Sequence, residues 1–198
     1  MKKGYTLSEV MVTMTILGIL ASILLPTIAR FRPNKDKMLF KKAYYITERV
    51  VYELINDDDY YPTDDGFKNV RHIAYLNGEH SGDTKFCTLF SKKVNIIDDV
   101  ANCDNGHHVP SGGGTFTEPT FYTSDGIAWY MPIWDFDIVQ KIRYISVDVN
   151  GSQEPNCISG AANCTKPDIF KIYVEADGKM YVSGEKEKEY LRSNTTTR

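Results

Sequence analysis

The feature that constrains this chain most is an apolar run that directly follows two N-terminal lysines. From Tyr5 to Leu25 there are 21 residues with a single formal charge, that of Glu9. In helical form this run is long enough to cross a hydrocarbon core of about 30 Å. Lysines that flank a span stay in the cytoplasm. We therefore expect Lys2 and Lys3 inside the cell and the chain after Leu25 outside the cytoplasm.

The run lacks the features of an ordinary secretory signal, which has a shorter apolar region followed by a small-residue cleavage site of the A-x-A kind. Here Ile19 stands two positions before Ala21, where that site would need a small residue. The small residue that stands out, Gly4, precedes the apolar run. Cleavage after Gly4 would leave the hydrophobic helix on the mature protein.

These residues resemble the prepilin leader of type IV pilins and of the pseudopilins of type II secretion. The matching residues are Gly4, Tyr5, Thr6, Leu7, Glu9, Gly18 and Pro26. The resemblance implies that a prepilin peptidase cuts between Gly4 and Tyr5 and that the new amino group of Tyr5 is N-methylated. Most family members have Phe where this chain has Tyr5. The resemblance covers the N-terminal segment alone.

Glu9 is the residue that physical chemistry singles out. A carboxylate inside a membrane span is costly, so such groups are usually paired and functional. The sequence has no lysine or arginine between Tyr5 and Leu25 to pair with it. The resemblance supplies a partner, the N-terminal amine of a neighbouring subunit, and this pair would set the axial register of a filament. The alternative is that Glu9 reaches headgroup water near the helix end and has no role.

Thr6, Gly18 and Pro26 are the other positions to which the resemblance assigns a part in assembly. Glycine is weak in a helix interior and proline removes a backbone hydrogen bond, so the turns between Gly18 and Pro26 are the least secure of the helix. In related filaments this stretch can lose helicity on assembly. A kinked helix without any switching is the alternative.

All four cysteines lie beyond the span, in a compartment where disulfides persist. Of the three possible pairings, the simplest is Cys87 with Cys103 and Cys157 with Cys164, because each pair then closes a local loop. A zinc site made from all four is the alternative, but the sequence contains no C-x2-C pair and the spacings do not suit one. We predict two disulfides.

The expected fold class is α+β and pilin-like. After the span, apolar residues recur at helical spacing at Leu39, Ala43, Ile46, Val50 and Leu54. By resemblance, the two segments form one long N-terminal helix, membrane-spanning in its first half and amphipathic in its second, packed on a small antiparallel β-sheet. We expect a bend at Pro33 and the end of the helix near 56–59, where turn residues precede Pro62.

The domain organisation that follows has six segments. They are a cleaved leader (1–4), the transmembrane helix (5–25), its amphipathic continuation (26–56), a variable region (57–126), an antiparallel sheet with a disulfide-closed loop (127–184) and a polar tail expected to fray (185–198). Strand signals lie at 127–133, 142–149, 169–176 and 179–184, and Asp177-Gly178 between the last two indicates a hairpin. We predict three or four strands.

Two polar clusters contain residue types that bind metal ions. The acidic stretch of Asp57, Asp58, Asp59, Asp64 and Asp65 lacks the alternating spacing of an EF-hand, which favours a solvated turn. The four histidines, His72, His80, His107 and His108, do not share a face at helix or strand spacing, so we do not predict a histidine cluster.

The aromatic residues Trp129, Tyr130 and Trp134 could form a sugar or partner patch, but aromatics on strands are more often core.

The loop between the second and third predicted strands is the stronger cation candidate. Asp148 and Asn150 are oxygen ligands two residues apart, Gly151 permits a sharp turn, and Asp168 returns at the start of the next strand. The pattern D-x-N-G-x-x-x-P-N followed by D-x-F resembles the calcium loop of major pseudopilins, with an insert closed by Cys157 and Cys164. Calcium is thus the one cofactor considered, and none is required. The alternative is an Asx turn in which Asp148 and Asn150 bond local amides.

The resemblance implies a structural subunit rather than an enzyme: a pilin or pseudopilin in the bacterial inner membrane, single-pass, assembled into a filament in the periplasm or at the cell surface. Its partners would be other pilins or pseudopilins, the prepilin peptidase and an inner-membrane assembly platform. Removal of Lys2 and Lys3 changes the formal net charge from −3 to −5, which argues against nucleic-acid binding. The alternative function is a membrane-tethered extracytoplasmic ligand-binding domain that does not polymerise.

Overall fold

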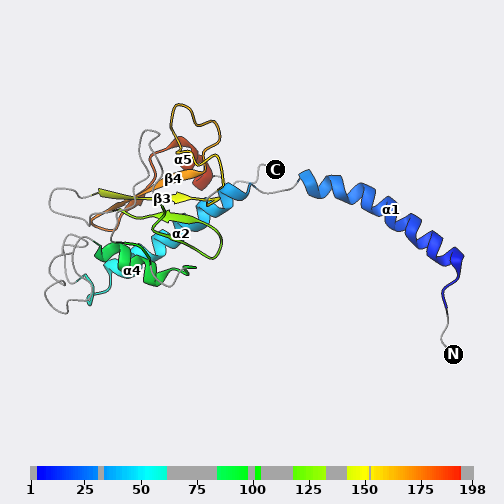
Figure 1. The fold of residues 1–198 in the computed structure, drawn as a ribbon, viewed down its shortest axis with the longest axis horizontal. Helices are drawn as coiled ribbons and strands as arrows, with labels where there is room; N and C mark the ends of the chain where they lie inside the picture. Colours follow the sequence, from blue (N-terminus) through cyan, green and yellow to red (C-terminus); the bar gives the residue numbers. More distant parts are fainter. Residues whose placement is uncertain are drawn as a thin grey trace. The chain divides into compact units, whose positions relative to one another are not determined.

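The computed structural model describes residues 4–30, 34–61, 84–97, 101–103, 118–132, 142–151 and 153–192. The chain divides into two compact units, Met1–Lys35 and Asp36–Arg198, and each is described by itself. Figure 1 shows the single helix of the first unit and the mixed helix and sheet structure of the second. The predicted bend at Pro33, the histidines and Trp134 lie outside the described residues.

The first unit contains helix α1, Leu7–Arg30, which continues through Pro26. Its apolar side chains have no cover in the described part of the chain: Leu17 is 59% exposed and Leu25 is 66% exposed. The segment Leu7–Pro26 is long and apolar enough to cross a membrane. This agrees with the predicted span at 5–25.

The second unit begins with helix α2, Lys35–Ile55. It ends at the predicted place, where the amide of Asp57 donates to the carbonyl of Leu54. The buried stripe differs slightly from the predicted one, because Leu39 and Ile46 are only partly buried and flank it. The stripe consists of Phe40, Ala43, Thr47, Val50, Val51 and Leu54.

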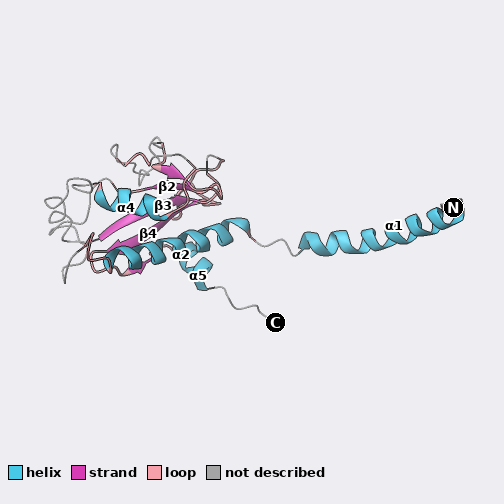
Figure 2. Cartoon of the chain, turned by 90° about the horizontal axis from the view of Figure 1, so that it is seen from below, coloured by secondary structure: helices cyan, strands magenta, loops and turns pink. Residues whose placement is uncertain are grey.

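Within the described residues the sheet has five antiparallel strands in the order β1-β2-β3-β4-β5, where three or four were predicted. The strands are β1 (Phe121–Tyr122), β2 (Ala128–Tyr130), β3 (Ile142–Asp148), β4 (Ile169–Glu175) and β5 (Met180–Tyr181). One face carries Trp129, Ile145, Val147, Phe170, Ile172 and Val174, which share one core with the stripe of α2. Figure 2 shows α2 along this face of the sheet.

Helix α4, Lys85–Lys93, covers the β1 end of the same core. Its Phe90 ring lies 5.5 Å from the ring of Trp129. The disulfide Cys87–Cys103 ties this helix to the chain ahead of β1, and the second disulfide, Cys157–Cys164, closes the loop between β3 and β4. Both predicted pairings are confirmed.

The chain after β4 forms the predicted hairpin at Asp177 and Gly178. The amide of Glu175 donates to the carbonyl of Lys179 at 2.8 Å, and Gly178 has a φ of +83°. A Cβ on Gly178 would lie 2.7 Å from Ile55 Cδ1, so glycine serves both the turn and its close approach to α2.

The prediction of a frayed polar tail was wrong for its first half. Residues Glu185–Arg192 form helix α5. Tyr190 is buried, and its ring lies 6.2 Å from Phe40 and 5.5 Å from Phe170. Tyr190, with the partly buried Leu191 beside it, packs this otherwise charged helix on the core.

Candidate functional site

The first candidate site is the N-terminal end of α1. Gly4 and Tyr5 precede the helix and are exposed, and Tyr5 is 89% exposed. An added Cβ on Gly4 would meet no atom within 4 Å. The bond between Gly4 and Tyr5 therefore stands clear of other groups in the described part of the chain.

Glu9 and Thr6 form a reciprocal cap at the start of α1. The backbone amide and the hydroxyl of Thr6 each donate to Glu9 Oε2 at 2.8 Å, and the amide of Glu9 donates to Thr6 Oγ1 at 3.3 Å. Ser or Thr followed three residues later by Glu is the capping-box pattern, which satisfies backbone donors at a helix start. The sequence reasoning sought a partner for Glu9 in another chain and missed this one within its own.

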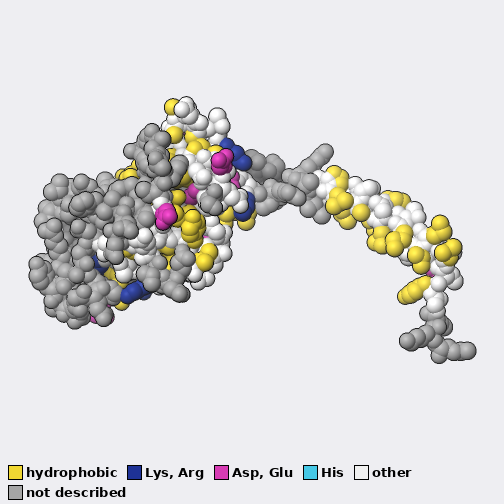
Figure 3. All heavy atoms as spheres, in the orientation of Figure 1, with side chains coloured by type: hydrophobic (Ala, Val, Ile, Leu, Met, Phe, Trp, Pro, Cys, Tyr) yellow, Lys and Arg dark blue, Asp and Glu magenta, His cyan; other side chains and the backbone are white. Residues whose placement is uncertain are grey.

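The span has few other polar groups, and three of its hydroxyls bond within the helix. Those of Thr13, Thr15 and Ser22 donate to the carbonyls of Val10, Met11 and Ile19 at 2.7–2.9 Å. Internal bonding of this kind removes the cost of placing a hydroxyl in lipid. Figure 3 shows hydrophobic side chains along the length of α1. The helical conformation continues from Gly18 to Pro26.

The second candidate site is the β3–β4 loop, and Asp168 organises it. This carboxylate is 2% exposed. Its Oδ1 accepts the amide of Cys157 at 2.7 Å, and its Oδ2 accepts the amide of Asn156 at 2.9 Å and the Asn150 side chain at 3.0 Å. Three donors on one carboxylate fix the loop's path and compensate for burying its charge.

Asp148 lies beside Asp168 and accepts fewer hydrogen bonds to offset its burial. It is 1% exposed, and its Oδ1 accepts the amide of Asn150 at 3.1 Å. Burial, followed by the charge of Asp168, raises the pKa of Asp148 to about 7. Asn150 Oδ1 is buried and has no hydrogen-bond partner among the described residues. The structure thus brings Asp148, Asn150 and Asp168 together, as the sequence pattern predicted.

Asn156 completes the loop and was missed as a site residue. Its side-chain amide is oriented by its neighbours, so that the nitrogen donates to Asp148 Oδ2 at 3.1 Å and to the carbonyl oxygens of Gly151 at 3.3 Å and of Gln153 at 3.2 Å. Asn156 has a φ of +47°, a conformation that Asn tolerates better than most residues. The second N of the D-x-N-G-x-x-x-P-N pattern was the signal that could have identified it.

Two further contacts hold the loop to the rest of its unit. Gly151 has a φ of +68°, and a Cβ there would lie 2.8 Å from the carbonyl oxygen of Gly126 in the β1–β2 turn. On the other side, the hydroxyl of Ser159 donates to the buried Glu187 of α5 at 2.9 Å. The loop is therefore fixed to both the sheet and the C-terminal helix.

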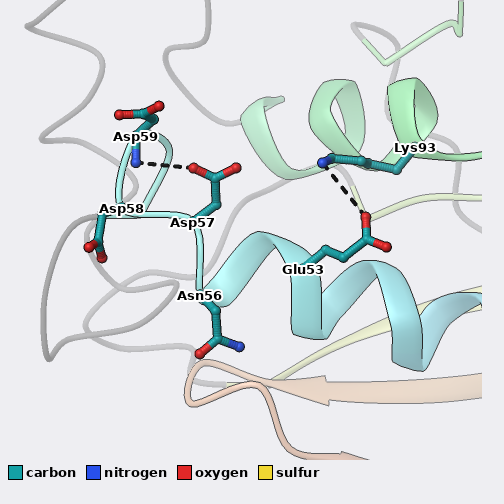
Figure 4. A pocket seen from close by; sticks show the side chains of 6 residues that line it. All are labelled: Glu53, Asn56, Asp57, Asp58, Asp59 and Lys93. Atoms are coloured by element: carbon teal, nitrogen blue, oxygen red, sulfur yellow. Dashed lines mark hydrogen bonds and ion pairs between the residues drawn. The ribbon is translucent and has the colours of Figure 1, made fainter.

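The acidic turn after α2 forms a pocket of about 480 Å³. Figure 4 shows its lining: Glu53 of α2 with Lys93 of α4 on one side, and Asn56, Asp57, Asp58 and Asp59 on the other. Glu53 pairs with Lys93 at 3.6 Å, and the amide of Asp59 donates to Asp57 Oδ1 at 3.1 Å, as in an Asx turn. The described acidic residues fit the predicted solvated turn. Asp64 and Asp65 lie outside the described residues.

The aromatic patch considered from sequence belongs largely to the interior. Trp129 is 0% exposed, and its indole nitrogen donates to Thr123 Oγ1 at 3.0 Å. Tyr130, on the opposite face of the sheet, is 7% exposed and packs with Ala128 and Ile169. Neither side chain offers a platform for a sugar.

Comparison with known proteins locates the functional signal in α1. Residues 1–25 match the family model described as the prokaryotic N-terminal methylation motif. No curated protein and no solved structure matches the chain. The matched segment contains the exposed Gly4–Tyr5 bond and the Glu9 cap, so the motif and the geometry of α1 coincide.

Proposed function

Because residues 1–25 carry the prepilin-type methylation motif of type IV pilins and pseudopilins, we propose that this chain is a structural subunit of a type IV pilus-like or type II secretion filament. A prepilin peptidase would cleave after Gly4, and the new amine of Tyr5 would be methylated. The observation that carries the proposal is the motif itself, placed on an exposed cleavage bond ahead of a membrane-length helix. Such a chain supplies packing surfaces rather than a reaction centre.

The hydrogen bonds of Glu9 are compatible with a role in assembly through α1. Both hydrogen bonds from Thr6 end on Glu9 Oε2, and within residues 4–30 Oε1 accepts none. A charged amine from a second copy could therefore reach Oε1 while the cap stays intact. In lipid or in a helix bundle, this ion pair would offset the cost of the carboxylate.

Helix α2 supplies a second surface for assembly. Its inner stripe is buried on the sheet, while Met38, Tyr45 and Tyr52, each seven residues apart, are 56%, 52% and 70% exposed. Residues seven apart lie on one side of a helix. We assign this side of α2, called here the Tyr52 face, to packing against neighbouring subunits.

The proposed location follows from the span. The chain would sit in the bacterial inner membrane with its N-terminus in the cytoplasm, assemble on an inner-membrane platform, and then extend with other pilins or pseudopilins into the periplasm or to the cell surface. The two disulfides are in keeping with an extracytoplasmic second unit. A tethered domain that never polymerises would need the same anchor but neither Glu9 nor the Tyr52 face.

Intact-mass analysis of the chain purified from its own membranes tests the processing. We expect a mass that lacks Met1 to Gly4, gains one methyl group and loses four hydrogens to the two disulfides. A full-length, unmethylated chain would refute processing and favour the tethered domain.

Assembly is tested with Glu9→Gln, which keeps an acceptor for Thr6 but removes the charge. We expect E9Q to be processed and folded yet absent from filaments isolated from cells. Glu118→Gln is the matched control, because Glu118 is an exposed carboxylate outside α1 and α2. Filaments formed equally well by E9Q would contradict the assembly role.

We also propose that the β3–β4 loop holds a calcium ion as a structural cross-link. The buried, unpartnered Asn150 Oδ1 and the carboxylate of Asp148 are hard oxygen donors of the kind that calcium takes, with Asp168 fixing the loop around them. Among the described residues no three His, Cys, Asp or Glu side chains gather, so amide and carbonyl oxygens would complete the site. The ion would supply positive charge to two buried carboxylates and order the sheet edge.

Thermal unfolding of the full chain in detergent, in calcium chloride and in a chelator, tests the ion. Calcium at a hundred times its Kd would stabilise the fold by about 2.7 kcal/mol. Asp148→Asn should abolish the shift and Asp58→Asn should retain it. An unfolding temperature that is the same in calcium and chelator would exclude the ion.

A further inference from the structure

Three lysines at the start of α2 form a basic surface that filament assembly does not explain. Lys37, Lys41 and Lys42 surround Met38 in the first two turns of the helix, and these four residues are called here the Met38 face. At about 100° per residue, the three lysines lie within about 100° of Met38 around the helix, and the buried Phe40 lies about 160° away. Met38 is 56% exposed and the Lys42 side chain is 55% exposed, so the face is directed away from the core.

The formal charge of the chain changes sign just after this face. Residues 30–42 contain six Lys and Arg and one Asp, which gives +5, whereas residues 43–198 contain fifteen Lys and Arg and twenty-four Asp and Glu, which gives −9. A negatively charged surface therefore attracts the first turns of α2 and repels the remainder of the second unit. This charge distribution favours one orientation of the second unit on such a surface, with the start of α2 toward it.

The connection to the span is short enough for the Met38 face to reach lipid headgroups. Of the twelve residue steps from Pro26 to Met38, seven lie within α1 or α2 at about 1.5 Å each, and five join the two helices at no more than about 3.6 Å each. At most roughly 30 Å of chain thus separates Met38 from the end of the span. A membrane that holds the span is always within reach of the face.

An exposed methionine among lysines suits the boundary between headgroups and acyl chains. Helices at this boundary carry Lys and Arg beside exposed apolar side chains, and the long lysine side chains extend their ammonium groups toward the phosphates. At an anionic membrane surface, each lysine increases the affinity roughly fivefold. Lys42 is already partly engaged, because its Nζ lies 2.9 Å from Asp125 Oδ2, and this pair fixes the face to the β1–β2 turn.

We propose that the Met38 face docks on anionic phospholipid headgroups while α1 anchors the subunit in the membrane. Lys37 and Lys41 supply most of the attraction, since Asp125 balances much of the charge of Lys42. This docking needs the span but not filament assembly. Met38 also belongs to the Tyr52 face, so a subunit that enters a filament would exchange lipid for protein at this residue.

Oxidation of Met38 by hydrogen peroxide, measured by mass spectrometry on the full chain held singly in lipid nanodiscs, tests the docking. An exposed thioether is oxidised to the sulfoxide, and contact with lipid shields it from the aqueous oxidant. The partly buried Met180 is the internal reference. Relative to Met180, we expect Met38 to react about fivefold more slowly in nanodiscs with about one-third phosphatidylglycerol than in phosphatidylcholine alone. In 1 M sodium chloride, where the Debye length is about 3 Å, the difference should vanish.

Two double variants separate the Met38 face from the overall charge. Lys37→Gln with Lys41→Gln keeps the Lys42–Asp125 pair, and the ratio of docked to undocked chain should fall about 25-fold, or fivefold for each lysine. Met38 should then react at nearly the same rate in both lipids. Lys166→Gln with Lys179→Gln makes the same charge change at exposed positions outside α2 and should preserve the difference between the lipids.

The proposal fails if the unsubstituted chain shows the same Met38 oxidation in both lipids. It also fails if both double variants lose the protection equally, because the effect would then follow the overall charge. Protection in phosphatidylcholine nanodiscs by inorganic phosphate, at the same concentration of negative charge, would mean a small-anion site instead of a membrane surface. A chain that does not enter nanodiscs would refute the span itself. Each nanodisc holds one chain, so these results are independent of filament assembly, which E9Q tests.

Discussion

Helices α1 and α2 are similar in length but deal with their apolar side chains in opposite ways. In the 24 residues of α1, Leu17 is 59% exposed and Leu24 is 54% exposed. The 21 residues of α2 bury one stripe completely, with Phe40, Val50 and Leu54 each 0% exposed. The first pattern requires lipid or another chain as its surroundings, and the second requires the sheet of its own chain.

The contrast shows where function can be recognised in this molecule. At the N-terminal end the cleavage bond, the cap and the span are all local in sequence, and the family match covers residues 1–25. In α2 the buried residues pack on partners far along the chain, as Phe40 does on Phe170 and Tyr190. Four predictions test whether the two helices are as different as this.

The largest effect is expected from truncating the buried stripe. Phe40→Ala should cost the second unit about 3–5 kcal/mol of unfolding free energy, because its ring packs 4.8 Å from Phe170 and leaves a cavity when removed. Leu17→Ala on α1 should leave that free energy unchanged. Urea unfolding of the full chain in detergent, followed by the fluorescence of buried Trp129, measures both. Equal losses would show that α1 stabilises the second unit.

The next effect concerns the disulfides, which act on the second unit only. By the chain-entropy estimate, replacing both cysteines by serine should cost about 3 kcal/mol for the pair 16 residues apart and about 2 kcal/mol for the pair seven apart. Hydrogen exchange of α1 amides in the same micelles should not change. Faster exchange in α1 would contradict the independence of the two units.

Local signals carried most of the successful predictions. The disulfide pairs close short loops, the hairpin follows from Asp177-Gly178, and the end of α2 follows from its turn residues. The stripe of α2 was misplaced by a fraction of a turn, because its centre includes Thr47. A buried threonine gives no apolar signal, and its hydroxyl is satisfied by donating to the carbonyl of Ala43 at 2.9 Å.

What the sequence did not reveal depends on long-range partners. Strand β1 has two residues and is recognisable only by its pairing with β2. Helix α5 is mostly charged, and it is positioned by Tyr190 and by the bond between Ser159 and Glu187. Asn156 became a site residue only when the fold placed its side-chain amide beside Asp148. In each case the decisive contact joins residues that no periodicity relates.

A smaller effect is expected where α2 meets the β1–β2 turn. Burial favours a higher pKa for Asp125, but hydrogen bonds from Thr123, Lys42 and the amide of Ile127 outweigh it and lower the pKa below 3.8. Lys42 Nζ lies 2.9 Å from Asp125 Oδ2. Because its pKa is lower in the folded chain than in the unfolded chain, the Asp125 carboxylate stabilises the fold at pH values above its unfolded pKa. That contribution is lost as the pH falls through its folded pKa.

Asp125→Asn should therefore cost about 1 kcal/mol at pH 7, and the difference from the unsubstituted chain should shrink as the pH is lowered from 7 through the folded pKa of Asp125. Urea unfolding over this pH range measures it, with Asp58→Asn as an exposed control. A difference between D125N and the unsubstituted chain that persists unchanged in acid would show that the hydrogen bonds do not depend on the charge.

The smallest effect on stability, and the sharpest test of the contrast, concerns the Tyr52 face of α2. Tyr52 is 70% exposed, so Tyr52→Ser should change the unfolding free energy by less than about 0.5 kcal/mol. If this face packs on neighbouring subunits, the same substitution should reduce filament yield, because aromatic residues contribute most to such contacts. Ile97→Ser, at a 62% exposed position outside α2, is the control. Full filament yield from Y52S would confine assembly to α1 and make the two helices as separate in function as they are in burial. Loss of filaments without loss of stability would mean that α2 has two apolar faces, one for its own sheet and one for another copy of the chain.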